Sequence, residues 1–340
     1  MRLTNEAELD EFLSRPYEED IEAMRGLGGD LMLLGVAGKM GVTLAIRARR
    51  AAAAAGVKMR VIGASRFGDA GARKQLEDAG VETIPVDLLD DAQLRELPDA
   101  ANIIHLAARK FGSTGDEPYT WAMNTYLPAR VAERFKHSRI CLFSSGNVYP
   151  LVPVTGGGAT EQTPLVPVGE YAVTALGRER MFTHFSSANG TRVAILRLNY
   201  AVELRYGVLR DIGEKVFGRR PVDLAMGNAN VIWQGDANSA MLRSFALASS
   251  PPLVLNLTGP ETISVRWVAE RFGELFGVKP EFEGTEGNTA LLNNAAKSFQ
   301  VFGYPRVSVV QIIEWLAAWI GGGGRSLGKP THFEARDGKF

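Results

Sequence analysis

The stretch Asp30-Leu-Met-Leu-Leu-Gly-Val-Ala-Gly-Lys-Met-Gly-Val-Thr-Leu-Ala45 decides the fold of this 340-residue chain. Its apolar run Leu31–Leu34 is typical of a parallel strand covered on both faces, and at Gly35 it ends in a turn that begins a helix. Gly38 and Gly41 follow in the same turn, and their bare backbone lets a pyrophosphate approach the amino end of the helix. Three glycines also occur in ordinary tight turns, so the pattern alone leaves both interpretations open.

Further strands and helices alternate after this turn. The first helix continues into an alanine run at 51–55, and residues 59–63 predict a second strand, which completes a β-α-β unit. A helix at 70–79 follows, and more strands are predicted at 82–86, 102–106 and 139–143. The alternation predicts an α/β fold with a Rossmann-type, doubly wound parallel sheet.

Composition excludes several classes of function. Lysine plus arginine and aspartate plus glutamate number 38 each, so no global charge attracts nucleic acid or a membrane surface. No apolar run is long enough to cross a bilayer, and residues 1–20 lack a signal-peptide core, which predicts a cytoplasmic protein. The single cysteine, Cys141, excludes intrachain disulfides, and the four histidines show no ligand spacing, so no metal is expected.

The two ends of the chain carry their own signals. Residues 1–29 predict a helical extension that packs on the main domain, with a regulatory or dimerising role as the alternative. Residues 321–340 begin with four glycines, which predict a flexible joint and a loosely held tail. His332, Phe333 and Phe340 suggest the alternative that this tail docks on its own cleft or on a neighbouring subunit.

The end of the second predicted strand bears on the choice of cofactor. A site for NAD usually has an acidic residue here for the ribose hydroxyl, whereas a nearby arginine accommodates the 2′-phosphate of NADP. Ser65 and Arg66 stand at this point and the acid is missing, which favours NADP over NAD. Lys39, inside the glycine turn, would add charge to the same phosphate. The alternative is that both cations are solvated at the surface.

The chain resembles the extended short-chain dehydrogenases/reductases of the NAD-dependent epimerase/dehydratase family over residues 30–320. The resemblance rests on motifs that occur in the family's order: the glycines 35–41, Asp87-Leu88, His105-Leu106-Ala107-Ala108, Asn124, Ser144-Ser145-x-x-Val148-Tyr149, Glu161 and Pro164 before Tyr171, Glu179, Arg197-Leu198-Asn199 and Gly235-Asp236. Together they are far more specific than any one of them.

The resemblance implies a dinucleotide site and a catalytic pair. Tyr171 would act as acid and base on a substrate hydroxyl while hydride moves between substrate and nicotinamide, and Ser145 would orient that hydroxyl. The implied cofactor-binding residues are Gly35, Gly38, Lys39, Met40, Gly41, Ser65, Arg66, Asp87, Leu88, Leu106, Ala107, Ala108, Ser144, Tyr171 and Leu198.

One position departs from the family pattern. A lysine four residues after the tyrosine normally stabilises its anion, and here that position is Ala175. Three explanations stay open: another cation takes over, an intrinsically easy reaction proceeds without one, or the protein binds dinucleotide without turnover. The candidates for auxiliary roles are Asn124, Arg109, Lys110 and Arg178, the last on the same helical face as Tyr171.

The resemblance places a substrate cleft beyond the sixth strand. Asn147, Asn199, Arg205 and Arg210 are the candidate substrate-binding residues, and arginines there suit a carboxylate or phosphate. Members acting on nucleotide sugars commonly have an arginine where this chain has Ala229. We therefore expect NAD(P)-dependent oxidation, reduction or epimerisation at a secondary hydroxyl or carbonyl of a sugar, sugar acid or nucleotide sugar. The alternative is a catalytically weak or inactive dinucleotide-binding regulatory or scaffold protein.

The resemblance also implies a division into domains. Residues 30–199, with 227–257 returning to them, would form the dinucleotide-binding domain, and 200–226 with 258–320 a smaller C-terminal substrate-binding domain. Family members often dimerise through two helices, here predicted at 120–135 and 171–185, so a homodimer is expected by analogy.

Overall fold

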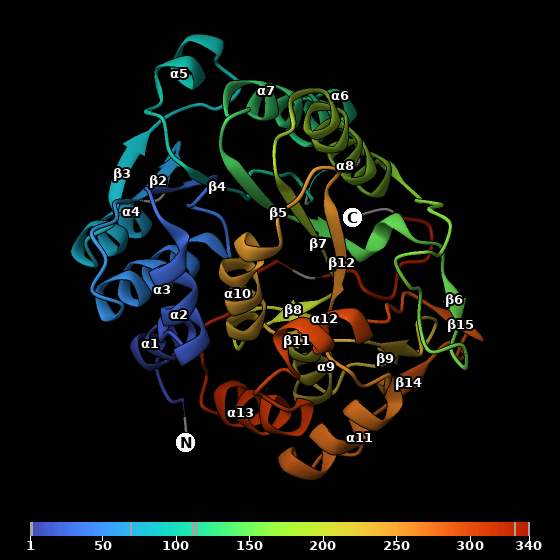
Figure 1. Cartoon of the computed structure of the whole chain (residues 1–340). Helices are drawn as coiled ribbons and strands as arrows, with labels where there is room; N and C mark the ends of the chain where they lie inside the picture. The colour runs from blue at the N-terminus through green and yellow to red at the C-terminus, as the bar shows by residue number, and fades with distance from the viewer. Residues whose placement is uncertain (1–2, 69, 111, 113–114, 330, 339–340) are drawn as a thin grey trace.

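A seven-stranded parallel sheet forms the centre of the molecule in a computed structural model that describes residues 3–68, 70–110, 112, 115–329 and 331–338 (Figure 1). The strand order is β12-β7-β5-β4-β1-β2-β3, which grows outward from β1 in both directions. This is the doubly wound arrangement predicted from the sequence. The strands are β1 (Leu31–Leu34), β2 (Val61–Ser65), β3 (Glu82–Pro85), β4 (Asn102–His105), β5 (Arg139–Ser145), β7 (Val193–Leu198) and β12 (Leu253–Leu257).

Helices cover both faces of the sheet, which is why β1 is apolar throughout. Leu31 and Leu33 belong to the core beneath the helices of one face, whereas Met32 and Leu34 belong to the core on the other. Successive strand side chains point to opposite faces, so an unbroken apolar run requires two such cores. The first face is covered by α2 (Glu18–Leu27), α3 (Gly41–Ala54), α4 (Ala70–Asp78) and α10 (Gln234–Arg243), the second by α5 (Asp91–Glu96), α7 (Leu127–Arg134) and α8 (Glu170–Asn189).

Several predicted elements are shifted or altered in the structure. The second strand occupies Val61–Ser65 rather than 59–63, and β5 continues two residues beyond its predicted end at 143. The helix predicted at 120–135 is composite: α6 (Glu117–Trp121) passes through a π-helical turn, η1 (Ala122–Tyr126), into α7. Such turns insert one residue per helical turn and often occur at functional sites.

The N-terminal extension packs on the first face of the sheet. Helix α1 (Glu6–Ser14) begins at Asn5, whose side chain accepts a hydrogen bond from the Glu8 amide at 2.9 Å, and α2 follows it. The Asp20 carboxylate of α2 accepts a 2.6 Å hydrogen bond from the Arg47 guanidinium of α3, and both side chains are fully buried. This ion pair joins the extension to the glycine-turn helix.

A C-terminal lobe lies beside the sheet and has its own apolar core. Three helices surround this core, α9 (Val208–Phe217), α11 (Val265–Phe276) and α13 (Val309–Gly321), with Phe272 fully buried between them. The remaining elements are α12 (Ala296–Phe302), the short helices η2 (Gly146–Val148) and η3 (Ser244–Leu247), and the strand pairs β6 (Val152–Pro153) with β15 (Thr289–Ala290), β8 (Ala201–Val202) with β11 (Ile232–Trp233), β9 (Val222–Asp223) with β14 (Phe282–Glu283), and β10 (Asn228–Ala229) with β13 (Ile263–Ser264).

The C-terminal tail differs from the loosely held terminus that its glycines predict. Phe333 is 1% exposed and belongs to the core of the C-terminal lobe, and Thr331 is equally buried. The chain leaves α13 at one edge of the molecule, and its described part reaches Gly169 at the start of α8 by Gly338 (Figure 1). Phe340, part of the docking alternative, lies outside the described residues. None of the described helices is long and apolar enough to span a bilayer.

Candidate functional site

Two adjoining cavities lie at the carboxyl ends of the central strands, around the glycine turn. Their volumes are about 300 and 370 Å³, and they share Gly35, Gly38, Leu106 and Ala108. Ligands of doubly wound sheets bind at this edge, where the strand order reverses. We call the first the adenosine cavity and the second the reaction cavity, after the parts of a dinucleotide that would occupy them.

The glycine turn has the geometry that a phosphate needs. Gly35 has φ +85° and a Cβ there would lie 2.6 Å from the Ala107 nitrogen, so only glycine fits. At Gly41 a Cβ would meet the Val36 carbonyl oxygen at 2.2 Å. At Gly38, by contrast, a Cβ would meet only the Gly35 oxygen, at 3.4 Å, so its backbone faces open space. A pyrophosphate fits over Gly38 at the start of α3.

The predicted cofactor-binding residues are brought together by the fold. The adenosine cavity is lined by Gly35, Gly38, Ser65, Arg66, Asp87, Leu88, Leu106, Ala107 and Ala108. The reaction cavity is lined by Lys39, Met40, Gly41, Ser144, Tyr171 and Leu198, together with the predicted catalytic Ser145 and the predicted substrate residues Asn147 and Asn199. Every one of these positions comes from a strand end, the glycine turn or the start of α8.

Lys39 does not lie where the sequence suggests. Its ammonium donates a 3.0 Å hydrogen bond to the Ala201 carbonyl and lies 3.7 Å from the centre of the Tyr206 ring, in the reaction cavity. The prediction that Lys39 contacts a ribose 2′-phosphate is therefore wrong, because its side chain lines the reaction cavity and not the adenosine cavity. Burial lowers the pKa of Lys39 to about 7. Repulsion from Lys110 and Arg205 lowers it further, whereas attraction from Glu203 raises it.

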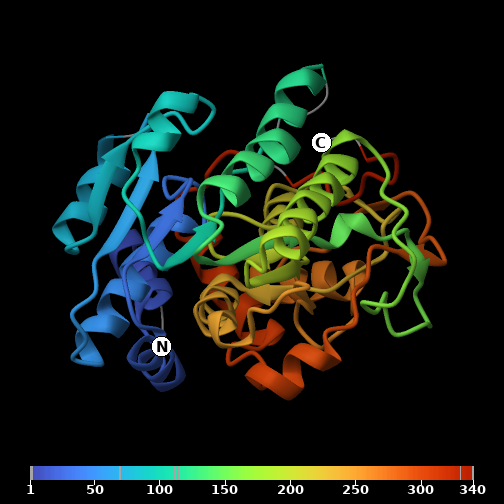
Figure 2. The ribbon, with the colours of Figure 1, turned by 45° about the horizontal axis from the view of Figure 1, so that its top comes forward.

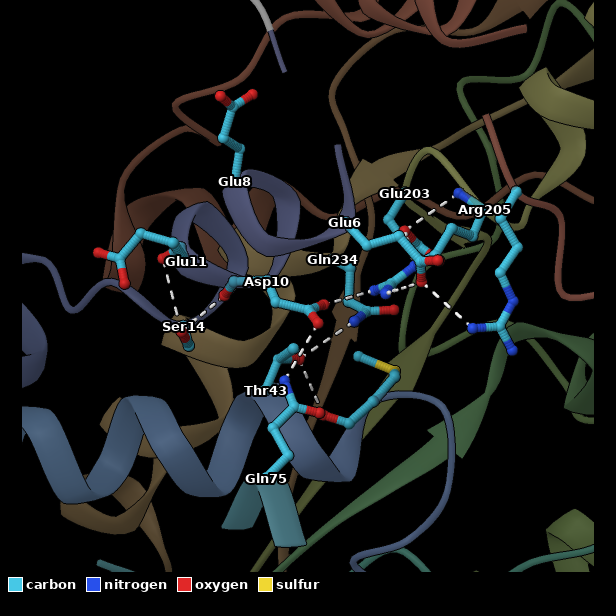
Figure 3. Close-up of polar contacts among 12 residues, drawn as sticks. Glu6, Glu8, Asp10, Glu11, Ser14, Thr43, Gln75, Glu203, Arg205 and Gln234 are labelled. Carbon is cyan, nitrogen blue, oxygen red and sulfur yellow. Dashed lines mark hydrogen bonds and ion pairs between the residues drawn. The ribbon is translucent and has the colours of Figure 1, made fainter. Parts of the chain in front are cut away.

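Arg205 and Arg210 are occupied by structural contacts rather than directed into the reaction cavity. Arg205 forms ion pairs with Glu203, Asp10 and Glu6, which tie α1 to the C-terminal lobe (Figure 3). Arg210 donates to the Leu204 carbonyl and to Glu214. Neither arginine belongs to the described lining of the cavity. The prediction of substrate contacts for both is wrong, since sequence position alone does not reveal these partners.

Two cations approach Tyr171 where the family pattern would supply a lysine. The Lys110 ammonium lies 5.8 Å from the centre of the Tyr171 ring, and burial lowers the pKa of Lys110 to about 8. Arg178, two turns further along α8, is 4% exposed and donates a 2.7 Å hydrogen bond to the Phe143 carbonyl. Its Nε and Nη2 have no hydrogen-bond partner in the described part of the chain, and its charge interacts with the Tyr171 phenol.

Asn124 holds the segment that carries Lys110. Its side chain accepts from the Arg109 amide at 2.7 Å, donates to the Arg109 carbonyl at 2.8 Å and donates to the Thr174 hydroxyl at 3.0 Å. Asn124 is fully buried in the π-helical turn, and Thr174 belongs to α8. It therefore positions Lys110 against the catalytic helix without lining the cavity itself.

Ala175 lies in an apolar cluster behind the reaction cavity. It is fully buried and packs with Val148, Tyr149 and Ala159. Arg197 and Glu179, a motif pair of the family, form a buried 2.7 Å ion pair, and Arg197 also donates to the Tyr149 hydroxyl at 2.6 Å. Ala229 is likewise fully buried, in the core of the C-terminal lobe.

Sequence reasoning missed several residues that line the reaction cavity. Tyr200 and Tyr206 contribute their rings from the segment after β7, and Lys329 and Thr331 reach the cavity from the C-terminal tail. The docking alternative suggested by His332 and Phe333 agrees with this path, but it does not single out Lys329 or Thr331, because their position depends on contacts with α9 and the lobe core. Among the described residues, no group of three or more His, Cys, Asp or Glu side chains is placed to hold a metal ion.

The family is established by comparison with known proteins. Residues 31–202 match the NAD dependent epimerase/dehydratase family. The chain belongs to this family. A search of curated proteins returned no match.

Solved structures share the fold at low sequence identity. The UDP-glucuronic acid 4-epimerase of Bacillus cereus, in complex with NAD, has a TM-score of 0.72 and 18% identity, covering 86% of this chain and 98% of its own. The UDP-glucose 4-epimerase of Thermus thermophilus, also with NAD, has a TM-score of 0.68 and 20% identity, covering 85% and 97%. The dTDP-glucose 4,6-dehydratase of Bacillus anthracis has a TM-score of 0.71 and 15% identity, covering 86% and 97%.

Proposed function

We propose that this protein is an NAD(P)-dependent oxidoreductase or epimerase that acts on a secondary hydroxyl or carbonyl of a sugar-like substrate. The observation that carries the proposal is the reaction cavity, in which Tyr171 and Ser145 share one space with the glycine turn. Family membership and the sugar chemistry named for the structural relatives support the same class of substrate. Bound nicotinamide would supply hydride exchange at the substrate carbon.

Tyr171 would transfer the proton at the substrate oxygen, with Ser145 orienting that oxygen. The Ser145 hydroxyl accepts from the Asn147 amide at 3.1 Å and donates to the Asn147 side chain at 2.9 Å, so its position is fixed by the start of η2. A hydroxyl held this way has lone-pair capacity left for a substrate. The phenol is a weak base near neutral pH unless positive charge stabilises its anion.

We infer that Lys110 and Arg178 together replace the lysine of the family pattern. The charge of Arg178 interacts with the Tyr171 phenol, which supports this role. Lys110, with its pKa lowered to about 8, stays mostly protonated at neutral pH and adds a second charge above the ring. The attraction between one positive charge and a phenolate a few ångströms away is about 1 to 4 kcal/mol across plausible dielectric constants.

We infer a preference for NADP over NAD from the adenosine cavity. Arg66 follows β2, lines that cavity and donates a 3.1 Å hydrogen bond to the Tyr119 hydroxyl. A guanidinium held by a second contact in this cavity suits a 2′-phosphate, for which arginine is well matched.

The homodimer and the cytoplasmic location also remain predictions. The composite helix of α6, η1 and α7 lies beside α8 (Figure 2), and Trp121 of α6, Tyr126 of η1 and Val173 of α8 are exposed there, which supports the proposed dimer face.

The direct test compares Tyr171→Phe and Ser145→Ala with the unchanged protein. Both variants should lose hydride transfer to sugars and sugar acids, while calorimetric binding of NADP stays within about two-fold, because neither change removes phosphate contacts. Tyr304→Phe is the matched control, since Tyr304 is 70% exposed and remote from the cavity. Full activity in both site variants would refute the assignment.

Ala175 favours a second candidate function, a dinucleotide-binding protein without turnover. This protein would bind NAD or NADP and turn over no sugar or sugar acid. The two functions differ in one readout: a single-turnover absorbance change on mixing the cofactor-loaded protein with a panel of polyols. Any reproducible change that Tyr171→Phe removes supports the enzyme.

A further inference from the structure

The C-terminal tail is held against the rest of the molecule by hydrogen bonds and by one buried aromatic ring. The Leu327 amide donates to the Arg205 carbonyl at 3.0 Å. The Thr331 amide and hydroxyl both donate to one oxygen of Asp211 on α9, at 2.7 and 2.5 Å. Phe333, 1% exposed, is buried in the lobe core, so its ring is the main apolar anchor of the tail. These contacts hold residues 327–329 and 331–333 in a defined path.

Beyond Phe333 the tail lies between the loop before α8 and the C-terminal lobe. The Arg336 guanidinium donates to the Ala225 carbonyl at 3.0 Å and to the Thr289 carbonyl and hydroxyl at 2.8 and 2.6 Å. A Cβ on Gly169, just before the helix of Tyr171, would meet the Gly338 oxygen at 2.2 Å, so the two backbones touch.

Little room is left between the tail and these walls. The remaining cavity has a volume of about 40 Å³ and lies between Val168 on one side and Met226 and Leu291 on the other, closed by Ala335, Arg336 and Gly338. Pockets for drug-sized ligands measure about 300–1,000 Å³. The tail therefore narrows the space that continues from the reaction cavity past Asn147 and Tyr200 into the lobe.

The reaction cavity that the tail closes is positively charged. Lys329 and Thr331 complete its lining, and the described lining also includes Lys39, Lys110 and Arg178 but no aspartate or glutamate. Two acids lie close by and offset part of this charge, since Glu203 attracts Lys39 and Asp211 attracts Lys110. Because four basic side chains and no acid line the cavity itself, it favours an anion.

We propose that the C-terminal tail sets the substrate class: the cavity beside Tyr171 receives a compact polyol with a carboxylate or phosphate bound by Lys329, and the tail excludes a nucleotidyl group. This inference rests on the proposed function, because it names the substrate of that same cavity. Carboxylate and phosphate share the anionic oxygens that an ammonium binds. A sugar acid and a sugar phosphate are therefore the two candidate substrates that the test must distinguish.

The test is calorimetry on the full-length protein loaded with NADP. D-gluconate, glucose 6-phosphate, neutral sorbitol, UDP and UDP-glucose are the probes. We expect one of the two anionic polyols to bind, UDP and UDP-glucose to give no heat, and Lys329→Gln to weaken the anionic polyol about ten-fold without affecting sorbitol. Lys58→Gln, an exposed lysine far from the cavity, is the control and should match the unchanged protein.

A variant with a released tail completes the design. Phe333→Ala should admit UDP, and Arg336→Ala, which removes only surface hydrogen bonds, serves if Phe333→Ala fails to fold. Binding of UDP-glucose to the unchanged protein, binding of neither anionic polyol, or equal polyol affinity in Lys329→Gln would overturn the proposal. Because binding is measured without turnover, failure of the proposed function appears separately, as bound polyol that never changes the nicotinamide absorbance.

Discussion

The ammonium of Lys110 lies 5.8 Å from the centre of the Tyr171 ring. Replacing Lys110 by methionine removes this charge, so kcat should fall by about ten- to a thousand-fold. The loss should be partly recovered in Lys110→Arg, which keeps the charge. In the unchanged enzyme the rate should bend near pH 8, where Lys110 loses its proton, and this bend should disappear in Lys110→Arg. Lys279→Met, at an exposed position, is the control, and an unchanged kcat in Lys110→Met would contradict the role.

Restoring the family's lysine should destabilise the protein. Ala175 is fully buried among Val148, Tyr149 and Ala159, so Ala175→Lys forces a long charged chain into apolar packing. We expect the free energy of unfolding in urea to fall by about 2–5 kcal/mol with no gain in turnover. Ala188→Lys, at an exposed position near the end of the same helix and outside the predicted dimer helix 171–185, should change it by under about 0.5 kcal/mol. Faster turnover at unchanged stability would mean that the lysine reaches Tyr171 after all.

Arg66 should distinguish the two dinucleotides. Arg66→Ala removes the guanidinium from the adenosine cavity, so the dissociation constant for NADP should rise about ten-fold or more while that for NAD changes little. Fluorescence or calorimetric titration measures both. Arg49→Ala, which contacts only the Gly80 carbonyl outside the cavity, should leave both constants unchanged. Equal weakening of NAD and NADP would argue against a 2′-phosphate contact.

Lys39 should make anion binding depend on pH. Its pKa of about 7 lies below its ordinary value of 10.5, so the folded protein binds fewer protons than the unfolded chain between these values, and stability rises with pH there. A bound pyrophosphate favours the charged ammonium, so binding above pH 7 should take up a proton and weaken by up to about ten-fold per pH unit. Calorimetry in two buffers of different ionisation enthalpy, one unit above that pKa, measures the uptake, which Lys39→Met should abolish. Identical enthalpies in both buffers would refute this.

The buried Asp20–Arg47 pair should hold the N-terminal extension in place. Asp20→Ala leaves a fully buried guanidinium without its counter-charge, so the free energy of unfolding should fall by about 3–5 kcal/mol. Glu22→Ala on the same helix removes only an exposed ion pair with Arg25 and should cost under about 1 kcal/mol. Urea unfolding compares them, and similar small losses in both variants would show that α2 docks without the pair.

Much of the site was predictable because it depends on short-range chemistry. Gly35 and Gly41 are required by contacts within a few residues or with the adjacent strand, and the carboxyl ends of parallel strands always meet at one edge. Ser145 and Tyr171, which were predicted from the resemblance to the family's motifs, line the reaction cavity together with the glycine turn. The π-helical turn around Asn124 was not predictable, because it depends on the tertiary contacts of the Asn124 side chain with Arg109 and Thr174.

By itself the sequence determined the doubly wound sheet and the glycine turn, because strand alternation and turn geometry are properties of neighbouring residues. Ser145 and Tyr171 were predicted from the order of motifs that the chain shares with its family. Only the tertiary structure decided which charges face the cavity. Lys39 lies over the Tyr206 ring, Arg205 forms ion pairs with acidic residues of α1, and Lys329, from the far end of the chain, lines the cavity. Long flexible side chains and a glycine-jointed tail have no local preference strong enough to fix their direction, so contacts between distant segments determine where their charges lie.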